Sequence, residues 1–137
     1  MKISTKTTYG LRAVIYLANT AKDGRICSIK EIAASEKISP DYLEKIISKM
    51  EKAGILEAQK GVKGGYKLAR PAKNIRLGEI VNVLEGESHF VQCVSSKDNI
   101  CPNRERCLAK NFWAKFQNKL NEFLDSITLE QIINNDL

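Results

Sequence analysis

The fold is decided by residues 38–69, which read ISPDYLEKIISKMEKAGILEAQKGVKGGYKLA. Ser39 is a favourable helix N-cap, and Pro40 follows at the first helical position, where its missing N–H costs nothing. Apolar residues then recur at helical spacing and form the expected core-facing stripe: Leu43, Ile46, Ile47 and Met50. Gly54 is the expected C-cap. We therefore expect a helix that begins at Ser39 and ends near Gly54.

The residues after this helix predict a β-hairpin. Two short extended segments run from Ile55 to Lys60 and from Tyr66 to Ala69, and the run GVKGG at residues 61–65 lies between them. A glycine-rich tip between two such segments is typical of a hairpin. Two short helices closely followed by a hairpin are the order of a winged helix-turn-helix. The predicted fold class is therefore mainly α with a small β-hairpin wing.

Two helices are expected before this segment. The first runs from Thr5 to about Ala21, and its helically spaced apolar residues are Leu11, Val14, Ile15 and Ala18. Apolar residues occur nearly all round this helix, so it must be buried on several sides. The second helix opens at Ser28, which forms the pattern of a capping box with Glu31, and ends near Lys37.

A long irregular stretch separates the helices that are expected after the wing. A fourth helix runs from about Leu77 to Glu85, and an irregular stretch follows and extends to Arg106. Together with Cys107, directly after it, this stretch holds three of the four cysteines. Such a long stretch inside a compact domain is usually functional or disordered. A longer helix from Leu108 to Ser126 has more apolar surface than a single small chain can readily cover. We therefore interpret it as a dimerisation helix.

Positive charge is concentrated in the first half of the chain. Residues 1–76 hold 16 Lys and Arg against 7 Asp and Glu, whereas residues 77–137 hold 6 against 9, within an overall net charge of +6. A basic excess on one part suggests a surface for a polyanion, although it can also simply favour solubility. We expect a winged helix-turn-helix DNA-binding domain at 1–76, and the cysteine-bearing loop with the dimerisation helices at 77–137.

The chain is expected to stay in the cytoplasm. Its longest apolar runs are far shorter than the roughly 20 residues of a membrane span. The first residues, MKISTK, lack the apolar stretch of a secretory signal. We therefore expect no membrane partner, and cysteines that are reduced by default.

Several short pieces of the sequence, taken in order, resemble the Rrf-two family of winged-helix regulators, which includes the IscR, NsrR, RirA and CymR types. The pieces are STK (4–6), ISPDYLE (38–44), GVKGGY (61–66) and LGEI (77–80). The resemblance covers nearly the whole chain. It implies a sequence-specific, DNA-binding transcriptional regulator of the IscR-like type. Since a helix-turn-helix protein usually pairs to read two half-sites, we expect a homodimer on double-stranded DNA with a palindromic operator.

The resemblance also implies which residues meet DNA. In IscR-like proteins the start of the third helix enters the major groove, and the matching residues here are Ser39, Asp41, Tyr42 and Glu44. A carboxylate there can accept from the cytosine amino group, or it can simply favour the helix dipole. Lys60 matches a wing arginine that reaches DNA in the family. The expected set is completed by basic and wing-tip residues: Lys45, Lys49, Lys60, Lys63 and Gly64.

Cys93, Cys101 and Cys107 are the candidate ligands of an iron-sulfur cluster, of the two-iron or the four-iron kind. Their spacing is not the paired C-x-x-C pattern of a zinc ribbon. Soft thiolates in a reducing compartment suit iron-sulfur ligation. The spacing resembles that of the RirA type. The fourth cysteine, Cys27, is expected to be a small structural residue.

The fourth ligand of such a cluster is not matched. IscR-like members supply a histidine three residues after the last cysteine, where this chain has Lys110, and NsrR-like members use an acid where it has Thr8. The remaining candidates are His89, Asp98 and Glu105. Three firm ligands and one exchangeable ligand would suit a sensor of iron, cluster, redox or nitric oxide status.

Two other functions stay open within the same fold. The cysteines can act as bare redox thiols or as zinc ligands. Alternatively, a CymR-like regulator is controlled by an enzyme partner such as cysteine synthase, which would dock on the acidic half of the chain. An enzyme is not expected, because the sequence has no nucleophile and base pair, and residues 61–65 lack the Lys-Ser/Thr ending of a phosphate-binding loop.

Overall fold

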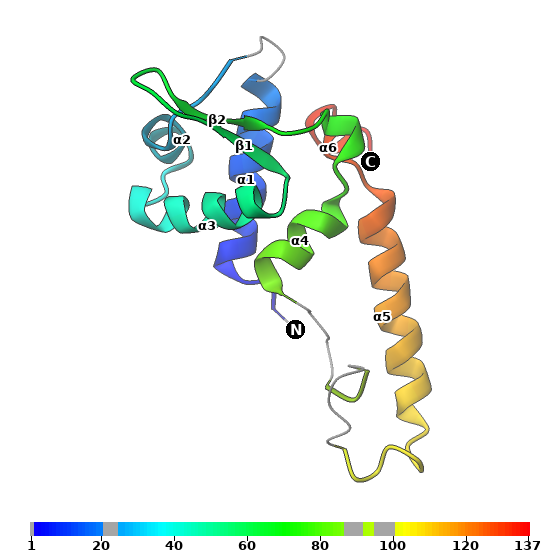
Figure 1. Cartoon of the computed structure of the whole chain (residues 1–137). Coiled ribbons are helices and arrows are strands. Elements are labelled where there is room, and N and C mark those ends of the chain that lie inside the picture. The colour runs from blue at the N-terminus through cyan, green and yellow to red at the C-terminus, as the bar shows by residue number, and fades with distance from the viewer. Residues whose placement is uncertain (1, 21–24, 87–91, 95–100) are drawn as a thin grey trace.

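The computed structural model describes residues 2–20, 25–86, 92–94 and 101–137. Along the chain its elements are α1 (Thr5–Thr20), α2 (Ile29–Glu36), α3 (Pro40–Lys52), β1 (Leu56–Gln59), β2 (Gly65–Leu68), η2 (Ala72–Asn74), α4 (Leu77–Glu85), η3 (Gln92–Val94), α5 (Ala109–Ser126) and α6 (Leu129–Ile133). This is the predicted class, mainly α with one small antiparallel hairpin (Figure 1). Within the described ranges, no helix has the length and apolar character that a bilayer crossing requires.

The core forms around α1, which lies between α2 and α3 on one side and α4 and α6 on the other (Figure 1). Its Ala13, Val14 and Leu17 are fully or almost fully buried. The predicted stripe of α3 faces this core, and its members are at most 1% exposed: Leu43, Ile46, Ile47 and Met50. The sequence therefore predicted the buried face of α3, whereas in the stripe predicted for α1 Val14 and Ala18 are buried but Leu11 and Ile15 are only half-buried. The expected helix end at Ala21 lies outside the described residues.

The ends of α3 follow from its capping residues. The Ser39 hydroxyl accepts a hydrogen bond from the backbone N–H of Tyr42 at 3.4 Å, and Pro40 occupies the first helical position. At the other end the C-cap is Ala53 rather than the predicted Gly54. Gly54 comes one residue later with a φ of 77°, a left-handed conformation that glycine adopts without a steric cost.

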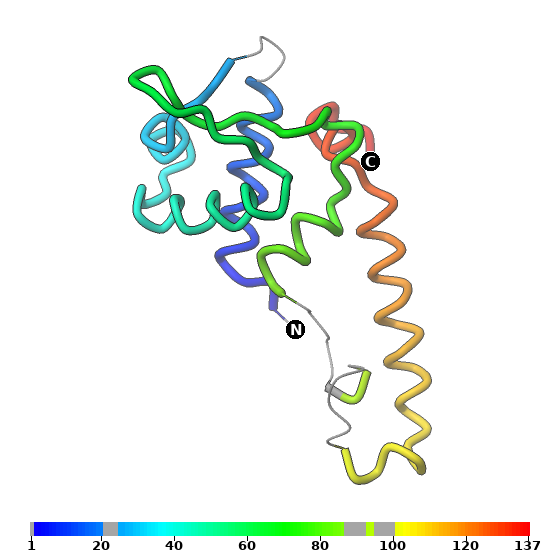
Figure 2. The backbone as a smooth tube through the Cα atoms, in the orientation of Figure 1, coloured from blue at the N-terminus to red at the C-terminus, as the bar shows by residue number. Residues whose placement is uncertain are grey.

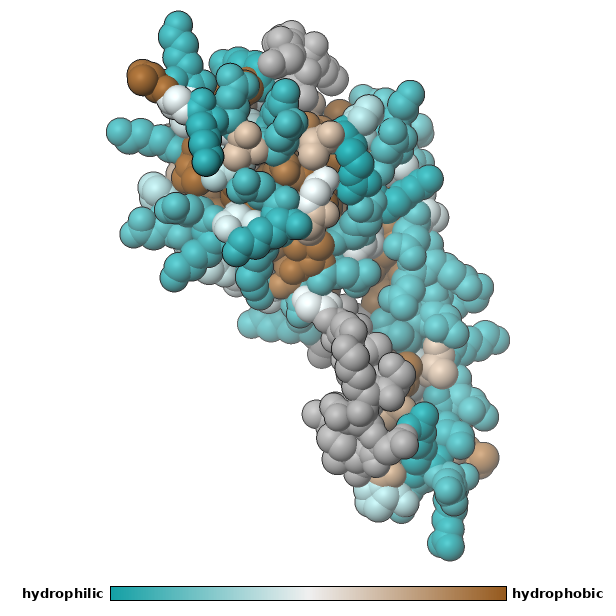
Figure 3. All heavy atoms as spheres, in the orientation of Figure 1, coloured by the Kyte–Doolittle hydropathy of each residue, from teal (hydrophilic) through white to brown (hydrophobic). Residues whose placement is uncertain are grey.

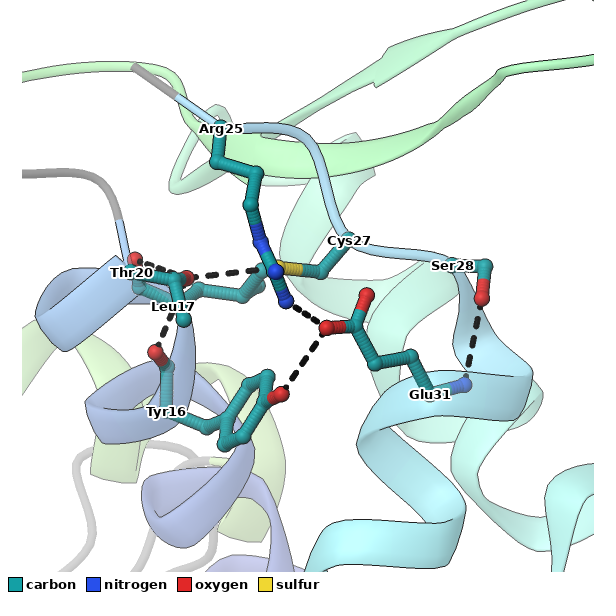
Figure 4. A network of polar contacts seen from close by, with 7 residues as sticks. All are labelled: Tyr16, Leu17, Thr20, Arg25, Cys27, Ser28 and Glu31. Atoms are coloured by element: carbon teal, nitrogen blue, oxygen red, sulfur yellow. Dashed lines mark hydrogen bonds and ion pairs between the residues drawn. The ribbon is translucent and has the colours of Figure 1, made fainter. Parts of the chain in front are cut away.

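Glu31 on α2 departs from the expected capping box. The Ser28 hydroxyl does accept from the backbone N–H of Glu31, at 3.1 Å. The Glu31 carboxylate, however, accepts from the hydroxyl of Tyr16 at 3.0 Å and pairs with Arg25, so it faces α1 and the segment before α2 (Figure 4). A long-range partner therefore replaces the local return bond. The helix ends at Glu36, and its C-cap is Lys37, which has a φ of 56°.

The wing consists of β1 and β2, whose register pairs Leu56 with Leu68 and Gln59 with Gly65. The segment before α2 adds to this sheet, because Cys27 and Tyr66 exchange backbone hydrogen bonds of 3.0 and 2.8 Å. A Cβ atom on Gly65 would lie 2.4 Å from the Cys27 carbonyl oxygen. Glycine at this position therefore lets the two backbones approach.

The C-terminal helices return to the body at the start of α4. The backbone N–H of Leu77 donates to Ile127 at 2.9 Å, and that of Leu129 donates to Ile75 at 2.9 Å. A Cβ atom on Gly78 would lie 2.0 Å from a carboxylate oxygen of Asp125, so α4 and α5 cross closely here. From this crossing α5 extends away from the body, and residues 101–108 lie at its far end (Figures 1 and 2).

Candidate nucleic-acid interface and cysteine segment

The predicted DNA-reading residues of α3 lie on its exposed side. Six of them are exposed: Ser39, Asp41, Tyr42, Glu44, Lys45 and Lys49. Ser39, Asp41 and Tyr42 lie at the N-cap and in the first turn of the helix, where the backbone N–H groups have no partner within the helix and carry partial positive charge. Glu44 and Lys45 follow one turn later, and Lys49 lies in the last turn. Hydrophilic side chains cover much of the α3 and wing side of the molecule in Figure 3. The structure therefore gathers these residues on a surface that is accessible to a polyanion.

The wing tip is built by glycines that leave little room for side chains. The backbone N–H of Gly64 donates to the Gly61 carbonyl at 2.9 Å, and Gly61 has a φ of 120°. A Cβ atom on Gly64 would lie 2.3 Å from the Gln59 carbonyl oxygen. Gly64 is therefore required by the turn itself. Lys60 directly precedes this turn, Lys63 lies within it, and both are exposed.

The acidic side of α3 lies beside the wing. Burial raises the pKa of Tyr66 on β2 above its usual value, and the nearby carboxylates of Glu51 and Glu44 raise this pKa further. Glu44 on α3 is thus close enough to Tyr66 on the wing for its charge to act on that ring, which the sequence pattern could not show.

The segment directly after the wing is joined to α4 by an ion pair that the sequence did not predict. The two guanidinium Nη atoms of Arg70 donate to the Glu79 carboxylate at 2.6 and 3.3 Å. Arg70 also donates to the Asn74 carbonyl at 2.9 Å, and the backbone N–H of Arg76 donates to Glu79 at 3.1 Å. The hydrogen bonds from Arg70 lower the pKa of Glu79 below its usual value. Glu79 belongs to the piece LGEI (77–80), and its place in this piece was the one sign in the sequence that Glu79 has a structural role.

The three C-terminal cysteines lie near the far end of α5 but are not gathered into a site. Cys93 is half-buried on η3, which contacts α5, Cys107 is half-buried just before α5, and Cys101 is exposed. Within the described ranges, no group of three or more His, Cys, Asp or Glu side chains is placed to hold a metal ion. Three free thiols suit an iron-sulfur cluster by their chemistry. Their arrangement here is not that of a preformed ligand shell.

The candidates for a fourth ligand gain no support from their positions. Glu105 is exposed in the turn before α5, whereas His89 and Asp98 lie outside the described residues. Cys27 is fully buried in the core, and its sulfur lies 3.2 Å from the hydroxyl oxygen of Thr20 (Figure 4). This position is that of a small packing residue.

Helix α5 has an apolar face that its own chain leaves uncovered. Phe112 and Phe123 are each 60% exposed, and among the described side chains of α5 only Gln117 is buried. Phe112 and Phe123 lie about three helical turns apart and therefore on one face. Phe112 also packs against Trp113 and Phe116, with ring centroids 4.9 and 6.3 Å apart.

A carboxylate at the end of α4 connects the start of the cysteine-bearing stretch to α1. Glu85 accepts from the backbone N–H of Ser4 at 2.7 Å, and the chain's start lies beside the end of α4 (Figure 2). A hydrogen bond from the Thr7 side chain, followed by those from Ser4, lowers the pKa of Glu85. Stability from this contact is present above the unfolded pKa and is lost as the pH falls through the lower folded pKa.

We therefore predict that Glu85→Gln destabilises the protein by about 1 kcal/mol at pH 7, because a hydrogen-bonded charge is lost. The difference from the unchanged chain should shrink as the pH falls below 4.5, the usual value for this carboxyl group. Urea unfolding at pH 7 and at pH 3.5 measures both effects. Glu122→Gln is the control, because among the described residues Glu122 forms an exposed ion pair with its neighbour on the helix, Lys119. Equal effects of the two substitutions would contradict the prediction.

Comparison with known proteins agrees with this arrangement. Residues 3–135 match the family Rrf2, described as an iron-dependent transcriptional regulator. The chain is 34% identical to the HTH-type transcriptional regulator IscR of Cereibacter sphaeroides, over 100% of this chain and 90% of that protein. The structure of T. potens IscR has a TM-score of 0.77 and 34% identity, and covers 100% of this chain and 89% of its own.

A second solved structure has the same fold. It is CymR, the global cysteine regulator of B. subtilis, with a TM-score of 0.78 and 34% identity over 98% of each chain. These matches identify the hairpin and the helices before it as a winged helix-turn-helix, as the sequence predicted. The matching proteins are named as regulators of transcription, so the expectation that the chain is not an enzyme is confirmed. The chain belongs to the Rrf2 family of DNA-binding transcriptional regulators.

Proposed function

We propose that this regulator binds a palindromic operator as a homodimer, and that an iron-sulfur cluster on Cys93, Cys101 and Cys107 controls its affinity for DNA. The observation that carries the DNA-binding part is the pairing of two exposed features. The exposed N-terminus of α3 and a glycine-tipped wing with two exposed lysines belong to the strongly basic half of the chain. Lysines and helix N-termini are the groups that hold DNA phosphates.

Residues on α3 and on the wing take different roles in this proposal. The exposed residues at the start of α3 approach base edges in the major groove: Ser39, Asp41, Tyr42 and Glu44. Lys45 and Lys49 neutralise phosphates along the helix. Lys60 and Lys63 bring the wing onto the neighbouring backbone, and Gly64 keeps the tip narrow. Phosphate contacts position the protein, whereas base contacts supply the specificity.

The uncovered face of α5 supports the homodimer. Phe112 and Phe123 are too exposed to contribute fully to the core of a single chain. A second copy of α5 would remove both rings from water, which favours association by about 25 cal/mol for each Å² of apolar surface that is buried. In this division residues 1–76 read DNA, while residues 77–137 pair the two chains and carry the cysteines.

The family description, an iron-dependent regulator, supports an iron-linked signal. Cys93, Cys101 and Cys107 would hold the cluster at the end of α5. A bound cluster would supply iron that can be lost or can meet oxygen or nitric oxide. Glu85 connects the stretch that leads to these cysteines with the start of α1. Through this contact, cluster binding at the cysteines would change the position of the DNA-binding domain.

A second candidate function uses the same cysteines as bare redox thiols. It is favoured by the exposed Cys101 and by the lack of a gathered ligand group within the described ranges. Iron and sulfide analysis of protein purified without oxygen separates the two functions. Stoichiometric iron and sulfide support the cluster, whereas their absence, together with DNA binding that responds to oxidants, supports the thiols.

We predict that Lys60→Ala weakens DNA binding and flattens its salt dependence. Each phosphate contact contributes about 0.9 to the slope of log affinity against log salt, so the slope should fall by about one for each protomer on the operator. Fluorescence anisotropy with a labelled duplex of the chain's own promoter, at several salt concentrations, measures the slope. Lys73→Ala on η2 is the matched control, since Lys73 is also an exposed lysine but lies outside α3, the wing and α5. An unchanged slope for Lys60→Ala would remove the wing from the interface.

A further inference from the structure

Tyr42 is the aromatic side chain among the proposed DNA-reading residues, and its ring is held from the side. It lies in the first turn of α3 and is 36% exposed. The rings of Tyr42 and Tyr9 meet edge to face, with centroids 6.0 Å apart and planes at 78°. This is a favourable geometry for two aromatic rings. Tyr9, which is half-buried on α1, therefore restricts where the Tyr42 ring can lie.

Tyr9 is in turn held by Arg12, one turn further along α1. The central guanidinium carbon of Arg12 lies 5.5 Å from the centroid of the Tyr9 ring. A cation over an aromatic face is attracted to its negative charge density. The position of the Tyr9 ring therefore depends on where the guanidinium is fixed.

Arg12 is fixed by the last residue of α2. Its Nε donates to the carboxylate of Glu36 at 3.0 Å, and its Nη2 donates to the Glu36 backbone carbonyl. Directly after Glu36 the chain turns through Lys37, with a φ of 56°, toward the N-cap of α3. Only the planar fork of arginine supplies two directed donors and a flat surface for the ring. Arg12 therefore joins the end of α2 to Tyr9.

These contacts form a continuous path from α2 through α1 to the proposed reading helix, in the order Glu36, Arg12, Tyr9 and Tyr42. We propose that Tyr9 and Arg12 are positioning residues that orient Tyr42 and so set the operator specificity of α3. The inference rests on the proposed function, because it takes α3 as the helix that reads DNA. Groups that read a partner must be held within about 0.5 Å of their working positions.

The proposed role differs from a contribution to folding. Arg12 and Glu36 have side chains that are 46% and 22% exposed, and an exposed ion pair contributes little to stability. Removing the guanidinium should therefore leave the fold intact. Its loss should change discrimination between DNA sequences, because Tyr42 would then sample several positions.

The test compares two labelled duplexes. One is a sequence that the unchanged protein selects from a random duplex library, and the other is a shuffled sequence of the same composition. Arg12→Lys and Tyr9→Leu should each lower the ratio of the two affinities by about tenfold, roughly the cost of one lost base contact. Tyr9→Phe should keep the ratio, because it keeps the ring. Arg25→Lys is the matched control, since Arg25 also pairs with a glutamate of α2, Glu31.

Each outcome decides the inference. It is overturned if Arg12→Lys keeps the original ratio, or if it weakens binding to both duplexes equally. In either case the proposed function still holds, provided that the unchanged protein selects a sequence from the library. If the unchanged protein selects no sequence at all, the proposed function and the inference both fail. Thermal melting identifies any unfolded variant. If Tyr9→Leu is unfolded, the comparison of Arg12→Lys with Tyr9→Phe decides the result.

Discussion

Cys101→Ala should abolish the visible absorption of the protein purified without oxygen and reduce its bound iron to background. Cys101 is exposed in the turn before α5, so its thiol contributes little to the packing of the fold. Removal of one of three thiolate ligands leaves two sulfur ligands, too few to hold a cluster that normally takes four protein ligands. Absorption spectra and iron analysis, both per chain, measure the loss.

Cys27→Ala is the matched control for this substitution. Cys27 is fully buried beside Thr20, so its replacement leaves a small cavity and costs some stability, but it should leave the bound iron unchanged. A Cys101→Ala protein that keeps its spectrum would remove this turn from the ligand set. Equal loss in both variants would mean that Cys27 also binds iron or that folding limits cluster binding.

Phe112→Glu should separate the dimer and lower operator affinity by about 100-fold or more. Phe112 is 60% exposed in the single chain, so the charge can be placed there without harm to the core. In a dimer the carboxylate would be buried in an apolar interface without a partner, which is strongly unfavourable. Two half-sites bound through one dimer gain affinity by a factor of about 100 to 10,000 over separate binding, and this gain is lost with the dimer.

Sedimentation velocity measures the change in mass, and anisotropy with the promoter duplex measures the change in affinity. Leu137→Glu is the matched control, because Leu137 is 81% exposed but lies beyond α6. It should leave both quantities unchanged. A Phe112→Glu protein that sediments as a dimer would contradict the assignment of α5 to the interface.

Local sequence signals predicted the helices well. The bounds of α4, Leu77–Glu85, are those expected, and Ser39 and Pro40 placed the start of α3 correctly. Capping residues and helical spacing act within a few residues, so one sequence is enough to see them. The exposure of Lys60 and Lys63 at a glycine-rich turn could be inferred for the same reason.

Contacts between distant residues could not be predicted in this way. Glu31 fits a local capping box, yet its carboxylate joins Tyr16 and Arg25 instead. The contact between Glu85 and Ser4 spans 81 positions of the chain, and no local pattern signals it. The contact between Tyr9 and Tyr42 likewise depends on how α1 crosses α3. Tertiary packing decides such pairs, because it sets which side chains come within reach.

The central claim is that the basic N-terminal half binds duplex phosphates under control of the cysteine-bearing segment. The most direct measurement titrates the unchanged protein against its own promoter duplex between about 50 and 200 mM salt, both loaded with iron and sulfide and stripped of them. We predict a linear fall of log affinity with log salt, and different affinities for the two forms. The account would be contradicted if neither form showed salt-dependent binding to any duplex.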